Sequence, residues 1–64
     1  MSIRDMAAEL VRAGYDNPEY KGQHGEWYHF HADKSGFFGS DRHEVRIKQG
    51  VFSPTIEKLG SVKF

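Results

Sequence analysis

The sequence contains no cysteine, and this absence removes three kinds of chemistry. Disulfide bonds, thiolate zinc sites and a cysteine nucleophile all require that side chain. A chain without disulfides fits a reducing compartment. No apolar stretch approaches the ~20 residues of a membrane-spanning helix, and the N-terminus lacks the basic and then apolar pattern of a secretory signal. We therefore expect a cytoplasmic protein with no membrane contact.

An excess of charge of either sign is also lacking. Nine basic and nine acidic residues give a net charge of zero, although residues 1–33 hold six of the acidic and residues 34–64 six of the basic ones. The two halves can attract each other inside the fold or give the surface a dipole that attracts a partner. The hydrophobic fraction is low at 38%, but 14% of the residues are aromatic. A length of 64 residues then predicts a single small domain, residues 1–64, of a size typical of small bacterial or phage proteins.

The first segment has the signals of a helix at both ends. Ser2 is a good N-cap, Asp5 stands where a capping box has its acidic residue, and Gly14 can take the left-handed conformation that ends a helix. Between them, apolar residues recur at helical spacing and form one stripe: Ile3, Met6, Ala7, Leu10 and Val11. We predict a helix over about 3–13.

Two segments alternate in the manner of strands. Residues 26–32 place rings on both sides, and residues 43–48 alternate apolar with charged side chains. The stretch 16–25 is rich in turn residues and is expected to be a loop, as are the turns at 33–36 and 39–41. Gln49-Gly50 ends the second strand.

The C-terminal part carries a second helix signal. Ser53-Pro54 is an N-cap followed by proline at the first helical position, which predicts a short helix over 54–59. Helices must cover an apolar face of the sheet. The fold class is then α+β with two layers: an N-terminal helix packed on a small antiparallel sheet (a hairpin or three strands), plus the short C-terminal helix.

Pairing of the two predicted strands gives a hairpin with two different faces. One face collects Tyr28, Phe30, Val45 and Ile47 and forms the core with the first helix. The other face collects the side chains that we predict to bind a partner: Trp27, His29, His31, Arg46 and Lys48. A charged row is usually a solvated face, but an aromatic ring among cations is typical of binding surfaces. Alternatively, the second helix covers Trp27.

The four histidines suggest two further kinds of site. His29-x-His31 places two imidazoles on one side of a strand, and a third zinc ligand would have to come from His24, His43 or Asp33. Such a pair is a weak motif, so we expect no metal and no cofactor. In acid–base catalysis, histidine can cleave RNA without a metal. The candidate is His24, with a cation supplied by Lys21, Arg46 or Lys48.

Partner binding without catalysis leaves two classes open. Bases can stack on Trp27 and on Phe37 or Phe38, while phosphates bind the cations Lys34, Arg42, Arg46 and Lys48. The zero net charge argues against nucleic-acid binding, because strong nucleic-acid binders are usually basic. A small neutral domain rich in aromatic residues can instead bind a protein or form a homodimer.

The segment Lys21-Gly22-Gln23-His24, after a helix that ends in Ala13-Gly14-Tyr15, resembles the start of HicA-type mRNA interferase toxins. Those proteins are similar to double-stranded RNA-binding domains, with one helix, a three-stranded sheet and a second helix. The resemblance implies that His24 is the catalytic histidine of a Gly-Ser-His-like motif, in which Gln23 replaces serine. It also implies that the family's last helix begins at Ser53-Pro54.

From these observations we predict a non-enzymatic binding module for a protein or nucleic-acid partner, which uses the aromatic, histidine and basic face of the hairpin. The alternative is a metal-independent ribonuclease toxin with His24 as acid and base.

Overall fold

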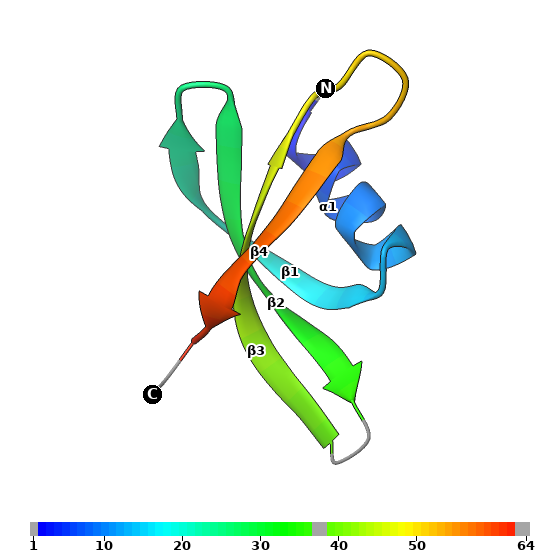
Figure 1. Ribbon diagram of the computed structural model, residues 1–64, viewed down its shortest axis with the longest axis vertical. Coiled ribbons are helices and arrows are strands. Elements are labelled where there is room, and N and C mark those ends of the chain that lie inside the picture. The colour runs from blue at the N-terminus through cyan, green and yellow to red at the C-terminus, as the bar shows by residue number, and fades with distance from the viewer. Residues whose placement is uncertain (1, 37–38, 63–64) are drawn as a thin grey trace.

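The computed structural model describes residues 2–36 and 39–62. It consists of one helix, α1 (Ile3–Arg12), followed by four strands: β1 (Tyr15–His24), β2 (Trp27–Gly36), β3 (Gly39–Lys48) and β4 (Thr55–Ser61). The strands form one antiparallel, strongly twisted sheet in the order β1-β2-β3-β4 (Figure 1). The α+β class is confirmed, with four strands in the sheet and not two or three.

Helix α1 begins and ends at the predicted signals. The Ser2 side chain accepts a hydrogen bond from the Asp5 backbone N–H at 3.1 Å, and the Asp5 carboxylate accepts one from the Ser2 N–H at 3.3 Å. This reciprocal pair satisfies two N–H groups that have no partner within the helix. Gly14 follows the C-cap with a φ of 97°, a conformation that glycine adopts without strain.

Substitution of Gly14 tests this helix end. Gly14→Ala is expected to lower the free energy of unfolding by about 1–2 kcal/mol, because a Cβ is strained at positive φ. Gly14→Asn should cost less, since asparagine tolerates the left-handed region. Urea unfolding of both variants measures the difference; equal stabilities of Gly14→Ala and wild type would contradict this account of the helix end.

Strand β1 occupies most of the segment that the sequence predicted to be a loop. Its turn residues become irregularities within a strand: the register with β2 shifts between Asp16 and Glu19 and again between Tyr20 and Gly22. Asn17 has a φ of 50° and Gly22 a φ of 140°. Both shifts have the character of β-bulges, which admit extra residues without ending the pairing, and an edge strand accepts Pro18 as well. The loop prediction was therefore wrong for residues 16–24.

The β2–β3 hairpin is longer than predicted. Residues 33–36 and 39–41, expected to form turns, continue the two strands, and the register runs without interruption from the Tyr28–Ile47 pair to the Gly36–Gly39 pair. Phe37 and Phe38, whose rings were predicted to stack on bases, lie outside the described residues. The alternation predicted for 26–32 and 43–48 is confirmed.

The predicted C-terminal helix over 54–59 is wrong, since β4 occupies this segment. Ile56 pairs with Ile47 and Glu57 with Arg46, so the backbone of β4 bonds to an existing strand. A helix of six residues has too few internal hydrogen bonds to offset its nucleation cost. The edge of β3 offers a full ladder of partners instead, which favours the extended conformation.

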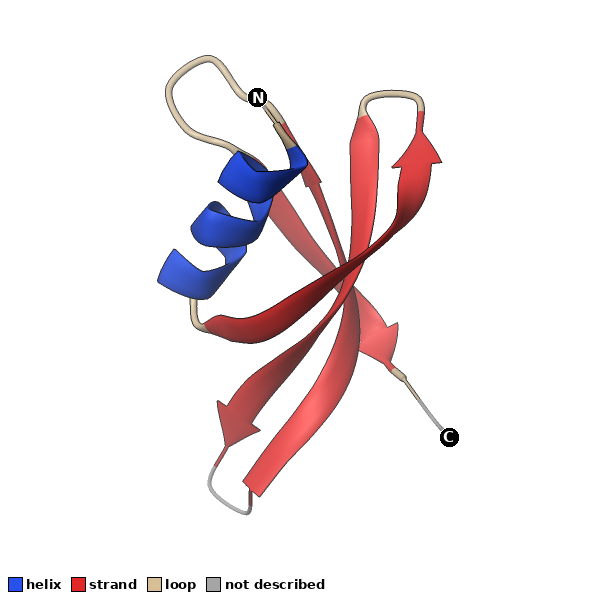
Figure 2. Ribbon diagram, turned by 180° about the vertical axis from the view of Figure 1, so that it is seen from behind, coloured by secondary structure: helices blue, strands red, loops and turns tan. Residues whose placement is uncertain are grey.

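One face of the sheet packs against α1 and holds the core (Figure 2). The buried apolar residues are Met6, Leu10, Tyr15, Phe30, Ala32, Val45 and Ile47. The opposite face, which we call the open face, has no described helix on it. α1, of ten residues, is shorter than a bilayer-crossing helix, and none of the described ranges contains a helix of that kind.

Candidate binding surface on the open face

The register of the strands brings the predicted binding residues together. His29 pairs with Arg46, which pairs in turn with Glu57 across β2, β3 and β4. His31 pairs with Glu44 one step along the strands, and Trp27 lies beyond His29 at the start of β2. Because side chains alternate along a strand, all of them lie opposite the core. The five predicted residues thus share the open face.

Trp27 is half-buried beneath two cations. The Cζ atom of Arg46 lies 4.0 Å from the centre of the indole ring, and the Nζ atom of Lys48 lies 4.9 Å from it. Both distances fall in the range of cation–π attraction. The cover over Trp27 therefore comes from β3, and the alternative in which a second helix covers this residue is wrong.

Glu57 on β4 fixes the position of Arg46. The Nη2 atom of Arg46 donates to both carboxylate oxygens of Glu57, at 3.0 and 3.1 Å. The Nε atom of Arg46 is buried and has no hydrogen-bond partner within the described residues. The guanidinium is thus held between an aromatic ring and a carboxylate, with its buried Nε–H group unused. The sequence prediction missed Glu57, because it assigned this residue to a helix.

Three histidine side chains lie close to this cluster, but they form no set of metal ligands. The rings of His24 and His29 meet edge to face with centroids 5.3 Å apart, and His29 Nδ1 lies 3.9 Å from the Glu44 carboxylate. His31 is half-buried, and its backbone oxygen accepts a hydrogen bond from Arg42. The described part of the chain contains no group of three or more His, Cys, Asp or Glu residues that could hold a metal ion.

A second ionic cluster joins three strands around Arg42. Its guanidinium donates to Asp33 at 3.0 Å and to Glu19 at 3.1 Å, and Asn17 donates to Asp33 at 3.3 Å. The hydrogen bond from Lys21, with its charge and that of Arg42, lowers the pKa of Glu19 below its ordinary 4.5. Hydrogen bonds from Asn17 and then from Arg42 lower the pKa of Asp33 below 3.8. The acidic and basic halves of the sequence therefore meet within the fold.

These two lowered pKa values predict an acid-dependent stability. A carboxylate with a lower pKa in the folded state stabilises the fold above its unfolded pKa, and this contribution is lost as the pH falls through the folded value. Arg42→Ala removes one cause for both groups. We expect its unfolding free energy to fall less steeply than that of wild type between about pH 5 and pH 3. The effect is small, since both groups are solvated.

Urea unfolding at several pH values measures this difference in slope. Lys58→Ala is the control, because it removes a cation from β4 and leaves the Arg42 cluster intact. Parallel pH profiles for Arg42→Ala and wild type would contradict the assigned cause.

Salt bridges occupy two of the four cations that were predicted to bind phosphate. Arg42 is paired with Asp33 and Glu19, and Arg46 is paired with Glu57. Lys48 is directed over the indole ring of Trp27. The open face is therefore a balanced network of charges around an aromatic ring, and not a continuous positive surface.

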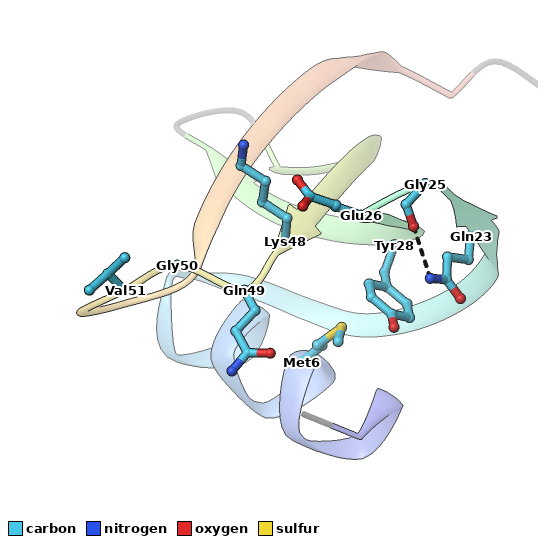
Figure 3. A pocket seen from close by; sticks show the side chains of 9 residues that line it. All are labelled: Met6, Gln23, Gly25, Glu26, Tyr28, Lys48, Gln49, Gly50 and Val51. Atoms are coloured by element: carbon cyan, nitrogen blue, oxygen red, sulfur yellow. Dashed lines mark hydrogen bonds between the residues drawn. The ribbon is translucent and has the colours of Figure 1, made fainter.

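The sequence prediction also missed a pocket at the end of the sheet where α1 begins. It has a volume of about 690 Å³ and lies between α1, the β1–β2 turn and the β3–β4 connection (Figure 3). Its lining residues are Met6, Gln23, Gly25, Glu26, Tyr28, Lys48, Gln49, Gly50 and Val51. They come from segments far apart in the sequence, so no local motif could have indicated the pocket.

Comparison with models of protein families, with curated proteins and with solved structures finds no match to this chain.

Proposed function

We propose that this protein is a non-enzymatic binding module that holds a protein partner on its open face, through Trp27, His29, His31, Arg46 and Lys48. The observation that carries the proposal is the Trp27 ring beneath the guanidinium of Arg46, on a sheet face that no helix of the described residues covers. Tryptophan and arginine dominate the binding energy of many interfaces. Glu57 holds the guanidinium in place before a partner arrives, which reduces the entropy that binding removes.

The charges of the open face favour a protein over a nucleic acid. A phosphate group would have to compete with Glu57 for Arg46, and with Asp33 and Glu19 for Arg42. Nucleic-acid affinity depends on cations that replace the counterions of phosphates, and the net charge of zero provides no excess of them. The lack of cysteine supports the cytoplasm as the place where this binding occurs.

Affinity capture with matched baits tests the proposal. Wild type, Trp27→Ala and Val11→Ala are immobilised, the last as a control that trims an exposed apolar side chain of α1. We expect a protein that wild type and Val11→Ala retain and Trp27→Ala loses. Titration of the ¹⁵N-labelled chain with the purified protein should then shift the amides of β2 and β3 around His29 and Arg46. Shifts confined to α1 would contradict the proposed surface.

Oligonucleotide titration distinguishes the two partner classes. Trp27 is the sole tryptophan, so its fluorescence reports directly on the open face. We expect no change with single-stranded RNA or DNA. A change in fluorescence that weakens with added salt would show that the partner is a nucleic acid and not a protein.

A metal-independent ribonuclease that resembles HicA toxins is the second candidate. The contact between the rings of His24 and His29 supports it, since two adjacent imidazoles can supply the acid and the base of phosphodiester cleavage. Incubation of RNA with the protein in EDTA tests this function. Cleavage that both His24→Ala and His29→Ala abolish would establish the ribonuclease function. Intact RNA would contradict it and favour the binding module.

A further inference from the structure

The two cations over Trp27 differ in their ion pairing. Arg46 is bound to Glu57 through its Nη2 atom, and no hydrogen bond within the described residues uses its Nη1 atom. Lys48 forms no salt bridge with a carboxylate of the described residues, although Glu26 lines the same pocket. This end of the open face therefore holds two cations, of which only Arg46 is paired with a carboxylate.

The other end of the open face has the opposite balance of charge. The carboxylates there are Glu19, Asp33 and Glu44. Their cations are Arg42, which donates to the first two, and Lys21, which is bound to Glu19. The open face is thus polarised along its strands, with an unpaired ammonium group at one end and an excess of negative charge at the other.

We propose that the open face binds an acidic peptide segment of its protein partner, with one aspartate or glutamate carboxylate placed over Lys48 and Arg46 on the side away from the indole ring. This inference rests on the proposed function and names the chemistry of the partner. An aromatic ring attracts a cation to its face and leaves the outer side of that cation free for an anion. Hydrogen bonds between a cation and a carboxylate are stronger than neutral ones, and a partner that excludes water strengthens them further.

The arrangement of charges fits a single carboxylate better than a chain of phosphates. Glu57 lies against Arg46 and repels a second anion on its own side of the guanidinium. A lone carboxylate can bind Lys48 and avoid Glu57. A nucleic acid brings a row of phosphates, which would also meet the carboxylates around Arg42. The polarity also orients the segment, since its acidic part belongs beside Trp27 and a neutral or basic part toward Arg42.

Two capped peptides that differ only in charge test this preference. One contains glutamate and leucine, and the other has glutamine in place of every glutamate. Isothermal titration calorimetry with the whole chain is expected to give a dissociation constant about tenfold lower for the glutamate peptide, and added salt should reduce the difference. Equal affinity for the two peptides, or no binding of the glutamate peptide, would overturn the proposal. Tighter binding of single-stranded DNA than of the glutamate peptide would also overturn it.

Two variants of the chain should change this affinity in opposite directions. Lys48→Gln removes the unpaired cation and is expected to raise the dissociation constant of the glutamate peptide by about tenfold. Glu57→Gln keeps an oxygen that accepts from Arg46 but removes the negative charge, so it should lower the dissociation constant by about threefold. Lys58→Gln is the matched control, because Lys58 pairs with Val45 and lies on the side of the sheet that faces α1.

Circular dichroism checks that each variant is folded. Weaker binding by Glu57→Gln as well as by Lys48→Gln would show a structural effect and overturn the proposal. If Glu57→Gln does not fold, Lys48→Arg replaces it: this variant keeps the charge and should keep the affinity of wild type. Equal losses with Lys48→Arg and Lys48→Gln would then overturn the proposal.

The protein captured by the open face separates this inference from the proposed function. Its retention by wild type but not by Trp27→Ala supports the binding module. An additional loss with Lys48→Gln, but not with Lys58→Gln, supports the acidic segment. Binding that requires Trp27 but is unchanged in Lys48→Gln would overturn the acidic segment and keep the binding module. Equal retention by wild type and Trp27→Ala would contradict the proposed function itself.

Discussion

Replacement of Phe30 by alanine is expected to unfold most of the protein at 25 °C. Phe30 is the largest fully buried side chain of the described residues, 1% exposed, and belongs to the part of β2 that contributes to the core with α1. Removal of a buried phenylalanine costs about 3–5 kcal/mol, from lost burial and from the cavity that remains. The total stability of a domain this small is rarely more than about 3–5 kcal/mol. The substitution therefore removes nearly all of the free energy of unfolding.

Trp27→Ala is the matched control, because it also removes a large aromatic side chain from β2. Trp27 lies on the opposite side of the strand, where cations and solvent surround it. We expect this variant to remain folded with a loss of about 1 kcal/mol, mainly the two cation–π contacts. Urea unfolding followed by circular dichroism compares the two variants. Similar losses at both positions would contradict the division of β2 into a core side and an open side.

The parts of the fold that the sequence predicted correctly depend on local patterns. The cap at Ser2 and the stop at Gly14 lie within one turn of the helix ends that they determine. The alternation in 26–32 places every second residue on the same face whatever the partner strand is. For this reason the open face and its five residues could be identified before the pairing was known.

Two of the wrong predictions concern strands that depend on pairing with a distant segment. β1 contains Pro18 and Gly22, and it is a strand because β2 provides its hydrogen-bond partners through two register shifts. In β4 the local signal at Ser53-Pro54 indicated a helix, but the edge of β3 offered a more favourable ladder. Local propensity is a weak prior against such tertiary pairing.

The ionic contacts of the site were only partly within reach of the sequence. The excess of acid in the first half and of base in the second is consistent with Arg42 meeting Glu19 and Asp33. The Glu57–Arg46 pair had no such signal, because it requires β4 to lie beside β3. That unpredicted pair changes the interpretation of the face, since it removes a cation from those available to phosphate.

A double-mutant cycle on partner binding tests whether Trp27 and Arg46 act as one unit. With the protein captured by the open face, Trp27→Ala and Arg46→Ala are each expected to weaken binding by about 2 kcal/mol, or about 30-fold in the dissociation constant. The double variant should lose much less than the sum, because Arg46 contacts the ring at 4.0 Å and either truncation already disrupts the other contact. Isothermal titration calorimetry measures all four affinities.

The same cycle with Arg42→Ala in place of Arg46→Ala gives the control. Arg42 belongs to the separate cluster with Asp33 and Glu19, so its effect should add to that of Trp27→Ala within about 0.5 kcal/mol. Additive losses for Trp27 and Arg46 would show that the partner contacts each side chain independently. The stacked arrangement would then contribute to the stability of the sheet and not to recognition, and the open face would lose the observation on which its proposed function depends.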